Sequence, residues 1–163
     1  HTGIRRQRQM CIRDSQNVLH FDKSANDDMT LTYHDSCNVA RASSMGGIMG
    51  GQFTIPRKII QTVANNFYDM DDETIREKTY CCGGGGGLLT DDLMELRVKG
   101  ALPRMEALKH LIEEKGVTHM AAICAICKSQ FSKVFQYYDL ELDQIVSLHQ
   151  LVSNALIMNK KEV

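Results

Sequence analysis

The chain contains 163 residues and carries 19 Lys and Arg against 20 Asp and Glu, which gives a formal net charge of -1 at pH 7. This near-neutral balance argues against a broad basic face of the kind that binds nucleic acid. With 43% hydrophobic and 24% charged residues, the composition is typical of one ordinary globular domain. No apolar run approaches the ~18 residues that a membrane-spanning helix needs, so we expect no direct membrane span.

The first fifteen residues differ in character from the rest. Residues 1–15 (HTGIRRQRQMCIRDS) contain four arginines and show neither helical nor strand periodicity. The string RQMCIRDS resembles translated sequencing-adapter read-through, so we interpret this segment as a non-native leader. The alternative is a disordered basic arm that touches acidic lipid or nucleic acid. Residues 16–163 then form the domain, which we expect to be a fragment of a larger subunit.

The number of cysteines indicates the cellular compartment in which the protein works. Six cysteines in 163 residues are far below the ~8–10% of a disulfide-stapled secreted scaffold. The basic start is not followed by the apolar stretch of a signal peptide. We therefore expect a reducing cytoplasm, where clustered thiols more often serve metal, cluster or redox chemistry than disulfides. Cys11 lies in the leader, which leaves five cysteines in the domain.

The first part of the domain is predicted to contain a strand and two helices. Residues 29–33 (MTLTY) alternate apolar and polar side chains and are rich in strand formers, which predicts a short strand. Asp35 or Ser36 can cap a helix over 38–44. Pro56 suits the first turn of a second helix over 56–67.

The middle of the chain is marked by glycines and prolines. Residues 78–82 are predicted to return as a strand, and five consecutive glycines follow it at 83–87. Thr90 and the two aspartates after it favour a helix start. The apolar spacing then predicts one or two helices up to Lys115, with a break or kink at Pro103.

The last part of the chain continues the alternation of strands and helices. Residues 117–123 (VTHMAAI) are apolar and short, as expected of a strand that is buried on both faces. A helix over 128–138, a short strand over 140–145 and a final helix over 147–158 follow. Repeated strand–helix alternation predicts an α/β fold with a mostly parallel sheet and flanking helices.

The five cysteines fall at related places in this pattern. Cys37, the pair Cys81 and Cys82, and the pair Cys124 and Cys127 each follow a predicted strand. Because open α/β folds bind their ligands at the carboxyl edge of the sheet, we expect all five thiols to meet there. Two of the three segments lead into helices, whose amino termini lower thiol pKa values and favour thiolates.

Several chemistries use cysteines in such a pattern. A thioredoxin-like redox pair at Cys124 and Cys127 would leave the other three idle. Structural zinc takes four ligands, whereas five thiols are one too many and an adjacent pair is an awkward bite for one ion. Inert buried cysteines are a further alternative. An iron–sulfur cluster fits better, because adjacent thiolates can bind different irons.

The glycine run has two interpretations. A phosphate-binding loop would need Lys and Ser or Thr after the last glycine, and Leu88-Leu89-Thr90 supplies no lysine. In a cluster-binding loop, the backbone N–H groups of Gly83, Gly84 and Gly85 could approach the sulfur atoms closely and tune the reduction potential of the cluster.

Three further polar residues are weaker candidates. His34 and His149 could contact the site or serve as hydrogen-bonded structural histidines. Lys128, next to Cys127, could attract an anionic substrate or be a solvated surface cation.

The cysteine motifs resemble those of a known family. The stretches that carry the resemblance are HDSC at 34–37, CCGGGGG at 81–87 and CAIC at 124–127. They are similar to the cysteine-rich CCG domain of heterodisulfide reductase catalytic subunits. The surrounding sequence is similar to the carboxyl-terminal part of the K subunits of membrane-bound redox complexes linked to dissimilatory sulfite reductase; it comprises MGGIMGGQF at 45–53, GLLTDDLMELRVKGALPRM at 87–105 and AAICAICKSQFSKV at 121–134.

This resemblance implies a specific cofactor and reaction. The cofactor is a noncubane [4Fe-4S] cluster held by the thiolates of Cys37, Cys81, Cys82, Cys124 and Cys127. The reaction is reduction of the disulfide or trisulfide of a small sulfur-carrier protein in dissimilatory sulfate or sulfite reduction, in one-electron steps. Electrons would come from membrane subunits that oxidise menaquinol, which would place the protein at the cytoplasmic face of the inner membrane. The alternatives are a docking module that holds zinc or a passive cluster, and the thioredoxin-like dithiol.

Overall fold

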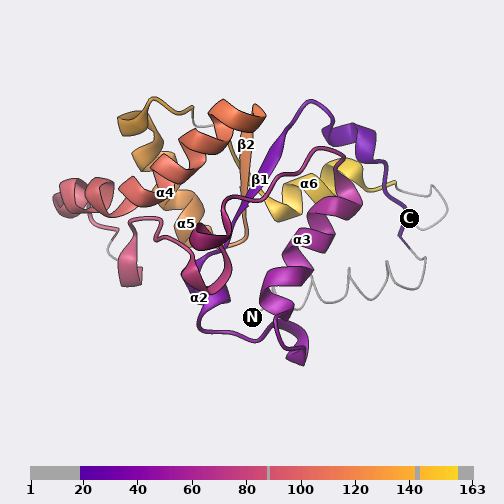
Figure 1. The fold of residues 1–163 in the computed structure, drawn as a ribbon, viewed down its shortest axis with the longest axis horizontal. Coiled ribbons are helices and arrows are strands. Elements are labelled where there is room, and N and C mark those ends of the chain that lie inside the picture. Colours follow the sequence, from indigo (N-terminus) through magenta and orange to yellow (C-terminus); the bar gives the residue numbers. More distant parts are fainter. Residues whose placement is uncertain (1–18, 88, 142–143, 158–163) are drawn as a thin grey trace.

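Three parallel strands form the centre of the protein, whose computed structural model describes residues 19–87, 89–141 and 144–157 (Figure 1). The strand order is β1-β2-β3, with β1 at Leu31–His34, β2 at His119–Ala122 and β3 at Ile145–Ser147. The helices are α2 (Cys37–Ala40), α3 (Gly51–Val63), α4 (Met94–Lys115), α5 (Ala125–Val134) and α6 (Leu148–Ala155). Short 3-10 turns lie at Lys23–Asn26, Met45–Gly47, Asp72–Thr74, Arg76–Lys78, Gly85–Gly87, Asp91–Leu93 and Phe135–Tyr138. The predicted α/β class with a parallel sheet and flanking helices is confirmed.

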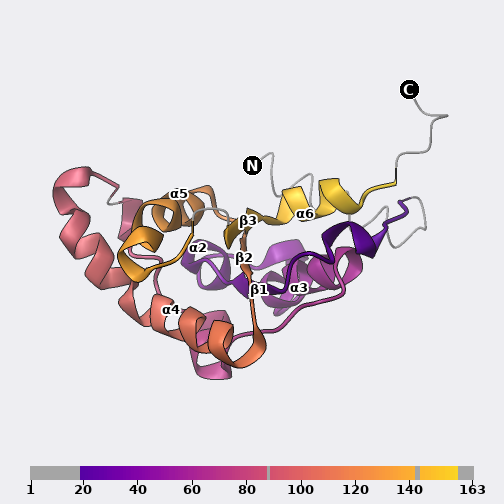
Figure 2. The ribbon, with the colours of Figure 1, turned by 90° about the horizontal axis from the view of Figure 1, so that it is seen from above.

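The helices cover both faces of the sheet. Figure 2 shows the sheet edge-on, with α4 and α5 on one side and α3 and α6 on the other. Successive strand side chains point to opposite faces, so Met120 of β2 enters the core beneath α4 and α5, while Ala121 enters the core beneath α3 and α6. Both faces of the sheet are therefore buried, which explains the apolar character of β2.

The carboxyl ends of β1 and β2 lie side by side. The two strands pair in parallel from Leu31 opposite His119 to His34 opposite Ala122. The chain leaves β1 into α2, whose first residue is Cys37, and leaves β2 through Cys124, the residue that caps α5. The sheet therefore places the first and the third cysteine segments at the same edge.

The strand predicted at 78–82 is not formed. This segment follows the turn at Arg76–Lys78 and continues as an irregular loop through Cys81 and Cys82. Its backbone bonds to side chains instead of to a neighbouring strand: Arg41 donates to the carbonyl oxygens of Glu77 (3.1 Å) and Thr79. Only two of the three cysteine segments therefore follow a strand.

The prediction that Pro56 occupies the first turn of its helix is wrong, and Pro103 does not divide its helix into two. Pro56 lies inside α3, which begins at Gly51, and Pro103 lies inside an unbroken α4. Pro103 is exposed, so the carbonyl of Lys99, which loses its N–H partner, can bond to water while the buried side of α4 stays packed. Gly116 ends α4 with φ +64°, as the sequence predicts.

The helix predicted at 56–67 ends early because the chain returns to the sheet. Leu31 donates its N–H to Asn66 O (2.9 Å), and Tyr68 donates to Leu31 O (2.9 Å). This parallel bridge at Phe67 extends the sheet beyond β1 and requires extended backbone where a helix would continue.

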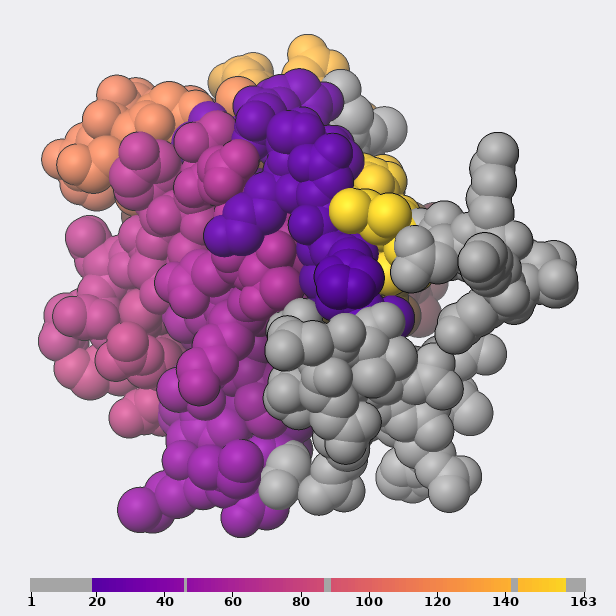
Figure 3. Space-filling view, turned by 90° about the vertical axis from the view of Figure 1, so that its right-hand side faces the viewer, coloured from indigo at the N-terminus to yellow at the C-terminus, as the bar shows by residue number. Residues whose placement is uncertain are grey.

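At the end of the protein opposite the cysteines, a buried asparagine links α3 to α6. Asn26 is fully buried, and its amide donates to Val63 O of α3 (2.8 Å) and to Leu151 O of α6 (3.0 Å). Figure 3 shows the indigo amino-terminal segment lying between purple α3 and yellow α6. Within the described residues, no helix is both long enough and apolar enough to span a bilayer.

Candidate metal centre

All five cysteines of the domain line one cavity of about 200 Å³. The volume is more than ten times that needed for one water molecule, so the space can hold a polyatomic group. The remaining wall is formed by small or uncharged residues. The full lining is Cys37, Asn38, Cys81, Cys82, Gly84, Gly85, Gly86, Cys124, Ile126 and Cys127.

Four of the thiols influence one another's ionisation. Cys82 lies close enough to Cys81 and Cys127, and Cys127 close enough to Cys124, for these thiols to shift one another's pKa values. Cys82 and Cys127 are buried, whereas the other three cysteines are partly exposed. Cys37 faces the same cavity from the start of α2, close enough to Cys81 for its charge to raise the pKa of that thiol.

These contacts divide the thiols into two kinds. Hydrogen bonds from Cys127 and Cys81 lower the pKa of Cys82, and the Gly84 N–H contributes. Hydrogen bonding from Cys127 and from the N–H groups of Cys127 and Ile126 lowers the pKa of Cys124 to about 5. The pKa values of Cys81 and Cys127 are raised, because these thiols are the donors and are partly desolvated. The site therefore favours thiolates, the form that binds iron, at Cys82 and Cys124.

The glycines have different places in the site. Gly84 and Gly85 line the cavity, as does Gly86, which the sequence analysis had not singled out. Gly83 does not line the cavity but donates its N–H to Cys81 Sγ at 3.3 Å. Its φ of +87° is one that other residues rarely adopt, so a glycine is required there.

One buried polar side chain near the thiols, that of His34, has no hydrogen-bond partner among the described residues. His34 is fully buried, lies edge-on against Phe131 at 4.8 Å and has no hydrogen bond at either ring nitrogen. Burial and the charge of Arg104 lower its pKa to about 3, so it is neutral at pH 7. The Ser36 hydroxyl is also buried, and its hydrogen bonding to Cys124 contributes to lowering the pKa of that thiol. Unsatisfied buried polar groups are consistent with a site built to face a further group.

The other two candidate residues lie outside the cavity wall. His149 is exposed on α6, and α6 packs with α3 on the face of the sheet opposite α4 and α5. Lys128 is partly buried in α5 and does not line the cavity, although its neighbour Cys127 does.

Buried arginines are site-supporting residues that the sequence analysis missed. Arg97 of α4 is 1% exposed; it donates to Gln130 Oε1 of α5 (2.8 Å) and to the carbonyl oxygens of Leu89 (3.2 Å) and Thr90 (3.1 Å). It thereby fixes the chain where it leaves the glycine run. In the sequence these arginines look like ordinary surface charges, because no local pattern marks their burial.

The donor set fits a cluster of several irons. Among the described His, Cys, Asp and Glu side chains, no group of three or more is arranged to hold a metal ion. The five thiols instead surround a larger space, and adjacent cysteines such as Cys81 and Cys82 can bind different irons of one cluster.

Comparisons with known proteins agree with the motif resemblance. The family model of the CCG cysteine-rich domain matches residues 31–132. The Hdr-like menaquinol oxidoreductase iron-sulfur subunit 2 of Archaeoglobus fulgidus is 44% identical over 137 residues, which are 84% of this chain and 23% of that protein. The Hdr-like menaquinol oxidoreductase iron-sulfur subunit of Archaeoglobus profundus is 44% identical over 140 residues, 86% of this chain and 24% of that protein.

The chain thus spans about a quarter of the length of these curated relatives. A comparison with solved structures found no significant match. The family match covers most of the described chain, including all three cysteine segments and the cavity that they line. This protein therefore belongs to the CCG cysteine-rich domain family, as a member similar to Hdr-like iron–sulfur subunits.

Proposed function

We propose that this chain is an electron-transfer oxidoreductase domain that binds a noncubane [4Fe-4S] cluster and reduces the disulfide or trisulfide of a small sulfur-carrier protein. The ligands would be the five thiolates of Cys37, Cys81, Cys82, Cys124 and Cys127. One observation carries the proposal: three separate segments of the chain bring these five thiols to the wall of one cavity. When bound, the cluster would supply electrons one at a time to substrate sulfur.

Backbone N–H groups of the protein suit the cavity to this chemistry. The N–H groups of Gly83 and Gly84 point at sulfur atoms on one side, and those of Ile126 and Cys127 at the amino terminus of α5 do so on the other. Such donors stabilise added negative charge on sulfur and tune the potential of a bound cluster. Reduction of one disulfide to two thiols consumes two electrons and two protons.

The cavity is open where the substrate would enter. Asn38, Gly85 and Gly86 are exposed at its wall, and Ile126 is 36% exposed. Cys82 and Cys127 lie deeper and are 4% and 2% exposed. A sulfur atom at the end of a protein segment could thus approach the partly exposed thiols while the inner ones stay shielded from water.

Partner subunits are part of the proposal. The similar archaeal proteins are named as subunits of Hdr-like menaquinol oxidoreductases. By analogy, other subunits of a membrane-bound complex would deliver electrons from menaquinol to this domain at the cytoplasmic face of the inner membrane. The function would be a step of dissimilatory sulfate or sulfite reduction.

One observation favours a second candidate, a thioredoxin-like dithiol. Cys124 has its pKa lowered to about 5 and contacts the buried Cys127, whose pKa is raised. A reactive thiolate beside a protonated partner is the arrangement of a C-x-x-C redox pair. This pair would react without iron, and Cys37, Cys81 and Cys82 would be dispensable.

Metal analysis of the chain separates these functions. The chain is reconstituted anaerobically with iron and sulfide, and then iron, sulfide and zinc are counted and the paramagnetic resonance spectrum is recorded after oxidation. The proposed function predicts about four irons and four sulfides per chain and a paramagnetic signal on oxidation. Stoichiometric zinc without iron would support the docking module. Disulfide reductase activity that needs only Cys124 and Cys127 would support the dithiol.

A further inference from the structure

We propose that Asp35 and Arg57 are positioning residues that set the place of the Cys81–Cys82 loop relative to Cys37, so that the thiols can share one cluster. The inference rests on the proposed function in taking the cysteines as ligands. It goes further by naming what holds the middle cysteine segment, which no strand supports.

The Asp35 carboxylate joins three parts of the chain. Asp35 is 2% exposed and lies two residues before Cys37. Arg57 of α3 donates to both of its oxygens, from Nη1 to Oδ1 at 2.9 Å and from Nη2 to Oδ2 at 2.7 Å. The backbone N–H of Arg76, at the start of the turn that leads to the cysteine pair, donates to Oδ2 at 2.9 Å.

The loop itself is fastened to the same residue. Thr79 Oγ1, two residues before Cys81, donates to the backbone oxygen of Asp35 at 2.7 Å. The buried Arg104 of α4 donates to Thr79 Oγ1 at 3.1 Å. The loop is thus held through both the side chain and the backbone of Asp35, and from the other side by α4.

Arg57 is held in turn by other groups. Its Nε donates to Asp69 Oδ2 at 2.6 Å and its Nη1 to Phe53 O at 3.0 Å; its guanidinium lies 5.3 Å from the centre of the Tyr33 ring. A two-pronged contact of this kind fixes orientation as well as distance, and a lysine cannot reproduce it. The position of Asp35 is therefore fixed by α3, independently of the cysteines.

These contacts determine the positions of Cys81 and Cys82. In a strand, the ladder of backbone hydrogen bonds would fix the register of the pair. Because the segment does not join the sheet, the two bonds at Asp35, from Arg76 and Thr79, share that role with the bonds that Arg41 and Arg104 make to Thr79. A shift of this loop would move two of the five thiols and leave those after β1 and β2 in place.

The test compares two variants with a matched control. Asp35→Asn removes the negative charge that Arg57 binds. Arg57→Lys keeps a positive charge but loses the paired donors that bind both carboxylate oxygens of Asp35. Asn26→Ala is the control, because Asn26 is also a fully buried polar group that ties elements together, at the opposite end of the protein. Each chain is checked for folding by circular dichroism and unfolding in urea, then reconstituted with iron and sulfide.

We expect both site variants to hold iron more weakly. The chelator concentration that removes half of the iron should fall roughly 10- to 100-fold, the usual cost of changing a residue that orients metal ligands. The control should lose urea resistance but retain iron like the unchanged chain. If Asp35→Asn does not fold, Arg57→Lys decides the question. Site variants that retain iron as firmly as Asn26→Ala would overturn the inference.

A second measurement is made without metal. A short thiol cross-linker should join Cys37 to Cys81 or Cys82 in the unchanged apoprotein and in Asn26→Ala, and at a clearly lower yield in the two site variants. Equal yields in all four chains would contradict the positioning role. If the unchanged chain binds no iron, the proposed function fails, and the cross-linking yields still decide whether Asp35 and Arg57 position the loop.

Discussion

Gly83 lies directly against the backbone of Arg97 in α4: a Cβ atom at position 83 would be 2.2 Å from Arg97 O. The residue also has φ +87°. The glycine run therefore contains at least one position where both the conformation and the space exclude any other residue. This close approach joins the loop that carries Cys81 and Cys82 to the long helix behind it.

Gly83→Ala should destabilise the protein by about 1–3 kcal/mol, because the added methyl group strains the backbone and collides with α4. The measurement is the free energy of unfolding in urea. Gly85→Ala is the control, since nothing lies within 4 Å of a Cβ atom there and its φ is not positive. Equal effects of the two changes would show that Gly83 is not tightly packed.

Arg97→Lys should cost about 1–3 kcal/mol, because a buried ammonium group cannot replace the bonds to Gln130, Leu89 and Thr90. The control is Lys99→Ala on the same helix. Lys99 pairs with Glu95 at 2.6 Å, but both side chains are largely exposed, so this change should cost under about 0.5 kcal/mol. A small effect at both positions would contradict the anchoring role of Arg97.

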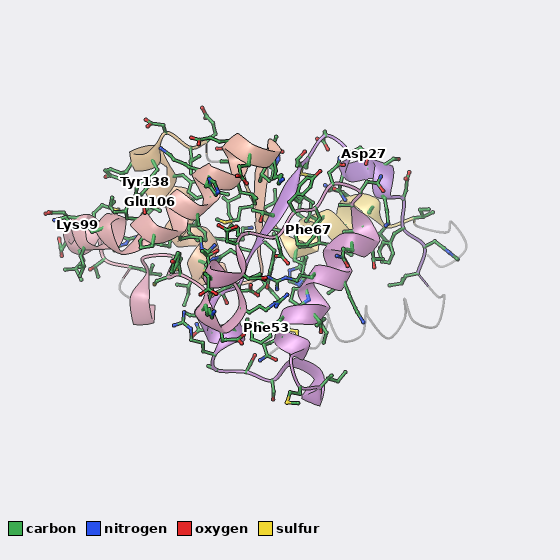
Figure 4. All side chains as sticks on the ribbon, viewed as in Figure 1. Asp27, Phe53, Phe67, Lys99, Glu106 and Tyr138 are labelled. Carbon is green, nitrogen blue, oxygen red and sulfur yellow. The ribbon has the colours of Figure 1, made fainter. Side chains whose placement is uncertain are left out.

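Tyr138→Phe should weaken the contact between α4 and the turn after α5. Tyr138 lies beside α4 in Figure 4, and its hydroxyl donates to Val98 O at 2.6 Å. Loss of this bond should lower the free energy of unfolding by about 0.5–1.5 kcal/mol. Tyr137→Phe serves as the control, because Tyr137 is 55% exposed and should be neutral. Indistinguishable urea curves for the two variants would refute the contribution of the bond.

Strands β1 and β2 were the most predictable part of the sheet, whereas the strand predicted at 140–145 overlaps β3 at Ile145–Ser147 in one residue only. The alternation at 29–33 and the apolar run at 117–123 locate β1 and β2 to within two residues, because burial in a sheet leaves a direct trace in local sequence. The stop of α4 at Gly116 was predictable for a similar reason, since a residue with positive φ favours glycine. The segments before Cys37 and Cys124 were therefore placed correctly from the sequence.

The middle cysteine segment could not be predicted in the same way. Residues 78–82 include strand formers such as Thr79 and Tyr80, but the hydrogen-bond partners of Thr79 are Arg41, Asp35 and Arg104, which are distant in sequence. Local propensity is overridden by such tertiary contacts. The motif resemblance indicated that the pair belongs with the other cysteines, whereas the buried polar contacts that hold it were visible only in the structure. The predicted leader at 1–15 lies outside the described residues.

The central claim is that one cluster is shared by all three cysteine segments, and Cys82→Ser tests it most directly. Cys82 of the middle segment lies close enough to Cys127 of the third segment for that thiol to lower its pKa, and both line the same cavity. After anaerobic reconstitution, iron and sulfide per chain are counted beside the unchanged protein, with Cys37→Ser as a second variant from the first segment. We predict that both variants lose most of the iron and sulfide and the paramagnetic signal of the oxidised cluster. Full iron and sulfide content and an unchanged signal in Cys82→Ser would contradict a cluster held by five thiolates.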